Sequence, residues 1–334
     1  MAELAREPKS NMYRRFFGLR ENPFSVNPDP RYLFLTKHVQ EALAALTYGI
    51  RNRKGFILLT GEVGLGKTTL LNHLLDWLQG ERVATAFVFN SLLKASDLFD
   101  FIIADFGIPC ESREKSHVLM RLNHWLLERH RAGQTAVVIV DEAQNLSLEV
   151  LEEIRLLTNL ETSTAKLLQI VLCGQPELED KLKLPQLRQL RQRITLRCRT
   201  FPLTLEEVSG YVTDRLRIAG ANGDAIFSRD AIQSVHRYSR GIPRLINLLC
   251  EHSMISAYVD HLRPIPARLV AEVAREFELD ESERTSPSLF AAEAERIADT
   301  QALVQNLNQL LGRLHQIDVA PTPVPLKGNH ESHP

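Results

Sequence analysis

Residues 61–69 read Gly61-Glu62-Val63-Gly64-Leu65-Gly66-Lys67-Thr68-Thr69. An apolar run at residues 56–59 comes directly before them, and a pattern typical of a helix follows at residues 70–75. A strand, the spacing G-x-x-x-x-G-K-T and a helix, in this order, form a P-loop (Walker A motif). The glycines let backbone N–H groups surround phosphate oxygens, and the helix N-terminus adds the positive end of its dipole. These residues therefore predict a site for a nucleoside triphosphate.

The positions within this motif have different expected roles. Lys67 should reach the β- and γ-phosphates, and Thr68 should place its hydroxyl on Mg²⁺. The rest of the motif is expected to surround the phosphates, and it consists of Gly61, Glu62, Val63, Gly64, Leu65, Gly66 and Thr69. ATP and Mg²⁺ are accordingly the expected cofactors.

A second motif follows the apolar run at residues 135–140, which ends in Asp141 and Glu142. Such a run fits a parallel strand buried on both faces, and ligands of open α/β sheets bind at the carboxyl ends of the strands. We expect Asp141 to hold Mg²⁺ through water and Glu142 to polarise the attacking water, as in a Walker B motif. The alternative is a strand that ends in a solvated acidic turn. The P-loop and an intervening strand near residues 83–89 favour the magnesium interpretation.

A glutamine at the end of a strand and a basic segment follow later in the chain. A fourth strand, at residues 167–173, ends at Gln175, which either senses the γ-phosphate or forms a turn before Pro176. Residues 181–199 then hold seven basic residues and no acid: Lys181, Lys183, Arg188, Arg191, Arg193, Arg197 and Arg199. The alternation at residues 194–199 predicts a fifth strand with one basic face.

The chain divides into six expected segments. They are an extended N-terminal arm at 1–35, an α/β nucleotide-binding domain at 36–201, a helical lid domain at 202–263, an acidic linker at 264–288, a C-terminal helix at 289–318 and a disordered tail at 319–334. Pro202 marks the boundary between the two domains. The apolar stripe of the helix at 289–318 fits either an interaction element or a helix that packs on its own protein.

Composition argues against a disulfide-rich, zinc-binding or membrane-spanning protein. The chain has 334 residues and a formal net charge of −1, so no global field attracts it to nucleic acid. Its four cysteines are widely spaced and suggest neither a disulfide framework nor a zinc site. No apolar run approaches 18 residues and no signal peptide precedes the arm. We therefore expect a cytoplasmic protein without a transmembrane segment, able to dock peripherally at the inner membrane.

The order of these motifs resembles that of an AAA+ ATPase. More closely, residues 13–262 are similar to the general secretion pathway protein A (ExeA-like) ATPases, as a short cytoplasmic form. The segments that carry this resemblance are Phe17-Gly18-Leu19, Asn22-Pro23-Phe24, Tyr32-Leu33-Phe34, Gly174-Gln175-Pro176-Glu177-Leu178, Leu190-Arg191-Gln192-Arg193-Ile194 and Gly241-Ile242-Pro243-Arg244. The resemblance implies a five-stranded parallel sheet ordered 5-1-4-3-2 and a small helical lid, with ATP at their junction.

The resemblance also implies roles for individual residues. Gln175 would sense the γ-phosphate, and Arg244 would be the lid arginine that contacts nucleotide in its own subunit. Arg193 would be the finger that reaches a neighbour's ATP, with Arg191 and Arg188 as rivals. These roles imply a homo-oligomer, for which a hexamer is the candidate.

The expected function is hydrolysis of ATP to ADP and phosphate, to drive or gate assembly of a bacterial envelope export, pilus or exopolysaccharide system. The alternative is a DNA-associated ATPase that regulates transposition target selection, which the basic residues at 181–199 favour and the neutral net charge disfavours. A third class, a scaffold that binds ATP without turning it over, is disfavoured by Glu142.

Overall fold

The computed structural model describes residues 12–25, 27–89, 94–110, 114–223 and 225–279. These residues all belong to one compact unit, which ends at Asp280. The expected C-terminal helix at 289–318 and the tail at 319–334 lie outside the described residues, as does the end of the expected linker. Those expectations remain predictions.

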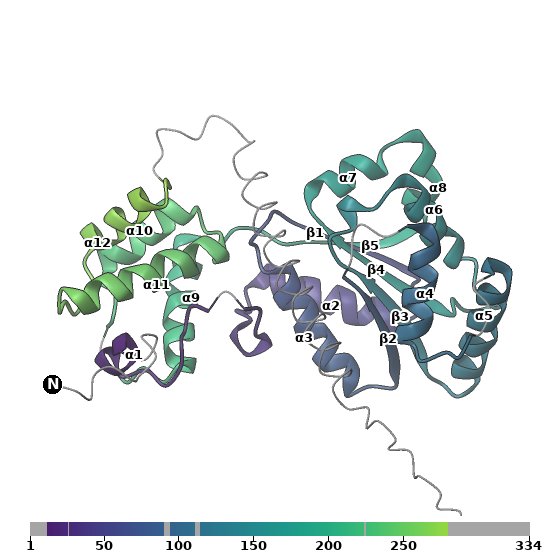
Figure 1. Ribbon diagram of the computed structural model, residues 1–334, viewed down its shortest axis with the longest axis horizontal. Coiled ribbons are helices and arrows are strands. Elements are labelled where there is room, and N and C mark those ends of the chain that lie inside the picture. Colours follow the sequence, from purple (N-terminus) through teal and green to yellow (C-terminus); the bar gives the residue numbers. More distant parts are fainter. Residues whose placement is uncertain (1–11, 26, 90–93, 111–113, 224, 280–334) are drawn as a thin grey trace, which may run out of the picture. The chain divides into compact units, whose positions relative to one another are not determined.

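A five-stranded parallel sheet forms the centre of the α/β domain (Figure 1). Its strands are β1 (Phe56–Thr60), β2 (Val83–Val88), β3 (Thr135–Val140), β4 (Leu168–Gly174) and β5 (Ile194–Arg199). Their order is β2-β3-β4-β1-β5, and every pairing is parallel. Read from the other edge this is 5-1-4-3-2, so the order expected from the resemblance is confirmed.

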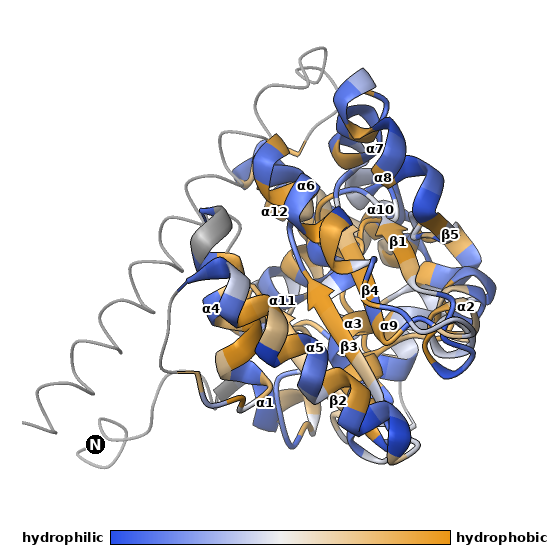
Figure 2. Ribbon diagram, turned by 90° about the vertical axis from the view of Figure 1, so that its right-hand side faces the viewer, coloured by the Kyte–Doolittle hydropathy of each residue, from blue (hydrophilic) through white to orange (hydrophobic). Residues whose placement is uncertain are grey.

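Burial explains the strand sequences. Every residue of β1, β3 and β4 is buried, which is why these strands read as continuous apolar runs. β5 lies at an edge of the sheet, and its Thr195, Arg197 and Arg199 are exposed. The basic face predicted for the fifth strand is therefore present. Figure 2 shows hydrophobic colour concentrated on the strands and hydrophilic colour on the outward parts of the helices.

Helices cover both faces of the sheet (Figure 1). On one face α2 (Lys37–Arg51) and α3 (Lys67–Gln79) pack on β1, β3 and β4 through residues such as Leu46 and Leu74. The other face carries α4 (Ala95–Asp105), α5 (Lys115–Arg131), α6 (Leu148–Leu157), α7 (Pro176–Leu182) and α8 (Arg188–Arg193). Short 3₁₀ turns, η2 (Pro30–Tyr32), η3 (Ala143–Asn145) and η4 (Pro185–Leu187), complete the connections.

The helical domain contains α9 (Leu205–Ile218), α10 (Arg229–Ser239), α11 (Pro243–Val259) and α12 (Ala267–Glu276). Thr204 and Glu207 form a capping box that begins α9, and Ser228 caps α10. The boundary expected at residue 263 is wrong, since α12 buries Leu269, Val270 and Val273 in the domain. This region is acidic, but it also carries an apolar stripe at helical spacing, and that stripe packs in the domain.

The N-terminal arm belongs to the core of the helical domain. Residues 12–17 form a short helix, α1 (Met12–Phe17), so the expectation of a wholly extended arm is wrong. Phe17 and Phe24 are buried in the same cluster as α9, α10 and α11. The buried Arg215 donates a 2.6 Å hydrogen bond to the carbonyl of Pro23 and lies 4.5 Å from the ring centre of Tyr32. Apolar packing and one cation–π contact thus hold the arm in place.

We expect Gly241→Ala to destabilise the protein strongly. Gly241 has a φ of 76°, and a Cβ there would lie 2.0 Å from the carbonyl oxygen of Leu203. Gly223→Ala is the matched control, because Gly223 also has a φ of 76° but has no atom near its Cβ position. The control should lower the free energy of unfolding by about 1 kcal/mol, which is the cost of the left-handed backbone alone. Thermal unfolding should show a clearly larger loss for Gly241→Ala, and equal losses would contradict the steric argument.

Candidate functional site

The P-loop lies between the end of β1 and the start of α3, where the sequence predicted it. Lys67 is the first residue of α3 and is only 6% exposed. Its ammonium donates hydrogen bonds to the carbonyl oxygens of Gly61 at 2.8 Å and Glu62 at 3.0 Å. A buried ammonium is stable only with such partners or an anion. The loop therefore holds a positive charge beside the N-terminus of a helix, which is an arrangement suited to phosphate.

The helical domain contacts the P-loop through the start of α11. The backbone N–H of Arg244 donates to the carbonyl oxygen of Gly64 at 3.2 Å. A Cβ on Gly64 would lie 2.9 Å from Cβ of Arg244 and 3.0 Å from Cγ2 of Ile242, so glycine permits this close approach. Arg244 is thereby placed next to the phosphate-binding loop, at the junction where the family resemblance implied a lid arginine.

Asp141 follows β3 and lies beside Thr68. The hydroxyl of Thr68 donates to Oδ2 of Asp141 at 3.2 Å. Asp141 is buried, and this burial, followed by the negative charge of Glu142, raises its pKa. A hydroxyl and one carboxylate are oxygen donors of the kind that Mg²⁺ accepts when phosphates and water complete its shell. In the described part of the chain, no group of three or more His, Cys, Asp or Glu side chains forms an alternative metal site.

Glu142 adopts an unusual backbone conformation. Its φ of 51° and ψ of 37° are left-handed, which costs a residue with a side chain of order 1–3 kcal/mol. Its Oε2 accepts hydrogen bonds from Nε2 of Gln144 at 2.6 Å and Nε2 of Gln175 at 3.3 Å. The structure therefore brings Gln175, at the end of β4, to the acid that follows β3.

Gln144 is a residue of this site that the sequence prediction missed. Its Oε1 accepts the backbone N–H of Gln175 at 3.0 Å, so it contacts both other polar groups. Its position, two residues after Glu142 and just beyond the buried strand, is the one sequence feature that could have indicated a role in the site. Spacing alone does not identify its partner, which comes from another strand end 31 residues later.

Most of the basic residues at 181–199 have partners in their own chain. Lys181 donates to the carbonyl oxygens of Gln144 at 2.5 Å and Leu146 at 2.9 Å. Arg199 pairs with Glu179, which also accepts from the hydroxyl of Thr60 at 2.6 Å. Burial acts to raise the pKa of Glu179, but the hydrogen bonds from Arg199 and Thr60 outweigh it and the pKa is lowered. The segment is therefore less of a free positive surface than its sequence suggested.

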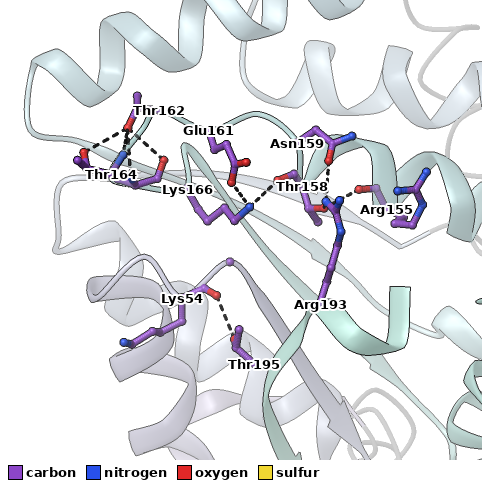
Figure 3. A network of polar contacts seen from close by, with 12 residues as sticks. Lys54, Arg155, Thr158, Asn159, Glu161, Thr162, Thr164, Lys166, Arg193 and Thr195 are labelled. Carbon is purple, nitrogen blue, oxygen red and sulfur yellow. Dashed lines mark hydrogen bonds and ion pairs between the residues drawn. The ribbon is translucent and has the colours of Figure 1, made fainter. Parts of the chain in front are cut away.

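Arg193 lies away from the phosphate site of its own chain. It comes directly before β5, whereas the P-loop follows β1, and these neighbouring strands are parallel. Its guanidinium donates to Oδ1 of Asn159 at 2.7 Å and to the hydroxyl of Thr158 (Figure 3). Arg188 and Arg191 are exposed, and their side chains have no hydrogen-bond partner among the described residues.

The structure thus brings together five predicted side chains at the carboxyl edge of the sheet: Lys67, Thr68, Asp141, Glu142 and Gln175. Arg244 lies beside this group through its contact with the P-loop. Arg193 does not join it.

Known proteins resemble this chain in sequence and in fold. Residues 50–182 match the family model described as an AAA domain. A relative, "General secretion pathway protein A" of Aeromonas hydrophila, is 48% identical over 248 residues, which are 74% of this chain. The chain therefore contains an AAA domain, and 74% of the chain is similar to part of a general secretion pathway protein A. The matched residues make up 45% of the length of that relative.

Solved structures agree on the AAA+ fold. Cdc6p from Pyrobaculum aerophilum is 20% identical with a TM-score of 0.59, covering 76% of this chain and 70% of that one. The ORC2 protein of Aeropyrum pernix is 17% identical with a TM-score of 0.57, covering 77% and 71%. The RuvB branch migration motor of Thermotoga maritima is 18% identical with a TM-score of 0.51, covering 74% and 71%. At these identities the likeness establishes the fold.

Among the residues that the structure describes, no helix could span a bilayer. Their helices are too short or too polar to cross a membrane.

We expect Arg193→Ala to lower thermal stability. It removes a guanidinium that bridges Thr158 and Asn159, and such charged hydrogen bonds contribute on the order of 1–3 kcal/mol. Arg191→Ala is the control, because Arg191 is exposed on the same short helix and should change stability by less than about 0.5 kcal/mol. Thermal unfolding of both variants tests this, and indistinguishable melting temperatures would show that the contacts of Arg193 carry no stability.

Proposed function

We propose that this AAA domain hydrolyses ATP to ADP and phosphate with Mg²⁺. The observation that supports the proposal is the convergence of Lys67, the Thr68–Asp141 pair and the hydrogen-bonded Glu142 at one edge of the sheet. An isolated P-loop would support nucleotide binding alone. A carboxylate held next to the predicted metal ligands adds a group able to orient water and accept its proton.

Each residue has a role in this mechanism. The backbone of residues 61–69 and the ammonium of Lys67 would hold the phosphates, as the buried positive charge of the loop suggests. Thr68 and Asp141 would hold Mg²⁺, which would supply positive charge to neutralise the phosphates. Glu142 would orient the attacking water and take its proton, while Gln175 would turn its amide toward the γ-phosphate. Arg244 would reach the nucleotide from the helical domain.

The complete catalytic unit requires a second copy of the chain in this proposal. A transition state of phosphoryl transfer carries charge that an arginine stabilises, and such a finger is worth roughly 10³–10⁵ in rate. Arg193 lies at the opposite end of the strands from its own P-loop, which fits a role toward a neighbour. Its hydrogen bonds within the chain favour Arg188 or Arg191 as the residue that makes this contact. We propose a homo-oligomer, with a hexamer as the candidate.

The biological role is proposed from the relative. Its name and the 48% identity support a part in secretion. We propose that the protein drives or gates assembly of an envelope export, pilus or exopolysaccharide system, as a cytoplasmic protein at the inner membrane. The rival role, a DNA-associated ATPase in transposition target selection, relies on the basic segment at 181–199. ATPase assays with and without duplex DNA separate the two, because only the rival predicts stimulation by DNA.

Lys67→Ala and Glu142→Gln should fail at different steps. Lys67→Ala should abolish tight ATP binding, because the phosphates lose their buried cation. Glu142→Gln should bind ATP normally and lose turnover by at least about a hundredfold, the usual scale for a positioned base. Binding of a fluorescent ATP analogue and release of phosphate measure the two steps. Glu206→Gln, an exposed acid on α9, is the control. Turnover of Glu142→Gln at the parental rate would refute the assignment of the base.

Mixing inactive variants should restore activity if the site is shared between subunits. Alanine variants of Arg188, Arg191 and Arg193 should be tested singly, and the one that is the finger should bind ATP without hydrolysing it. Mixed with Lys67→Ala protein, that variant forms some interfaces with an intact P-loop and an intact arginine. A mixture of Lys67→Ala with Glu142→Gln is the control, since it contains no complete interface. Failure of every arginine variant to recover on mixing would argue for a site complete in one chain.

A further inference from the structure

We infer that Gln144 is a positioning residue, whose carboxamide holds the carboxylate of Glu142 and links it to Gln175 at the end of β4. This inference rests on the proposed function, in which Glu142 is the base and Gln175 the sensor. With Gln144 holding the carboxylate of Glu142, the side chain of Gln175 could move from Glu142 to a γ-phosphate, and the carboxylate would stay where it is.

Both ends of the Gln144 carboxamide are engaged. Its Nε2 donates to Oε2 of Glu142 at 2.6 Å, and its Oε1 accepts the backbone N–H of Gln175 at 3.0 Å. A carboxylate only accepts and an N–H only donates, so these two partners fix which end of the amide is oxygen. Gln144 therefore bonds the predicted base and the backbone of the predicted sensor at the same time.

The surrounding structure holds Gln144 in place. Its own carbonyl oxygen accepts a 2.5 Å hydrogen bond from the ammonium of Lys181. Its side chain packs directly on Gly174, where a Cβ would lie 2.8 Å from Oε1 of Gln144 and 3.3 Å from its backbone nitrogen. The last residue of β4 thus leaves just enough space for the amide. A side chain fixed at both ends and packed on backbone can orient its neighbour.

The two amides that reach Glu142 are not equivalent. Oε2 accepts a 2.6 Å bond from Gln144 and a longer, 3.3 Å bond from Gln175. The side chain of Gln175 can therefore leave at the smaller cost, because the longer hydrogen bond is the weaker one. Its departure would free an acceptor position on Oε2 for the attacking water, while the bond from Gln144 keeps the carboxylate in place. Contact of Gln175 with the γ-phosphate would in this way prepare the base.

The test compares Gln144→Met with the parent protein. Methionine has a similar length and volume, so ATP affinity, KM and melting temperature should stay close to parental values. It forms neither hydrogen bond, so it should no longer hold the carboxylate of Glu142. We expect kcat to fall by about 10- to 100-fold, the scale of a misplacement of roughly 1 Å. Gln233→Met, on the exposed side of α10, is the matched control and should leave kcat unchanged.

A second pair of variants separates positioning from a merely structural role. If Gln144 acts through Glu142, adding Gln144→Met to Glu142→Gln should lower the residual rate no further. A structural role predicts instead a lower melting temperature and a rate loss that multiplies with that of Glu142→Gln. If Glu142→Gln is inactive while Gln144→Met turns over at the parental rate, the role of Gln144 is refuted and the proposed base survives. If Glu142→Gln is fully active, both assignments are refuted.

Discussion

A parallel sheet that is buried on both faces accommodates charged groups only where its strands end. β1, β3 and β4 are buried at every position, so a polar side chain in the middle of these strands is cut off from water. Such a side chain is stable only if it finds a buried hydrogen-bond partner. Parallel direction brings the carboxyl ends of these strands to one edge. The P-loop, the acidic pair and the amide at Gln175 meet there because the interior excludes them elsewhere.

This constraint explains which parts of the site were predictable. Lys67, Asp141 and Glu142 each follow an apolar run, so the local sequence shows both the strand and the residue at its end. The order of the strands came from the family resemblance, since periodicity says nothing of which strands are neighbours. Gln144 was missed because its partner, Gln175, belongs to a different strand end, and only the folded sheet places the two side by side.

Two features, the basic segment at 181–199 and the helix at 267–276, differ from what charge alone suggested. Runs of arginine and lysine look like a free basic surface in sequence, but Arg193 is paired with Thr158 and Asn159, more than 30 residues away. Charge counting likewise placed a linker over residues 267–276, although the spacing of Leu269, Val270 and Val273 already gave one apolar helical face. Contacts between distant segments, which local composition does not show, decided the surroundings of Arg193, whereas at residues 267–276 the apolar spacing was a better guide than the acidic composition.

The path of the arm has a consequence for how the chain folds during synthesis. The core of the helical domain contains residues 13–24 and residues 203–270, so the whole nucleotide-binding domain is inserted between two parts of one core. The arm leaves the ribosome well before the helices that cover Phe17 and Phe24. Its aromatic side chains remain without their native partners while about 180 residues are added, which at the usual speed of translation lasts roughly ten seconds or longer. The core of the helical domain can therefore form only after the whole nucleotide-binding domain has been synthesised.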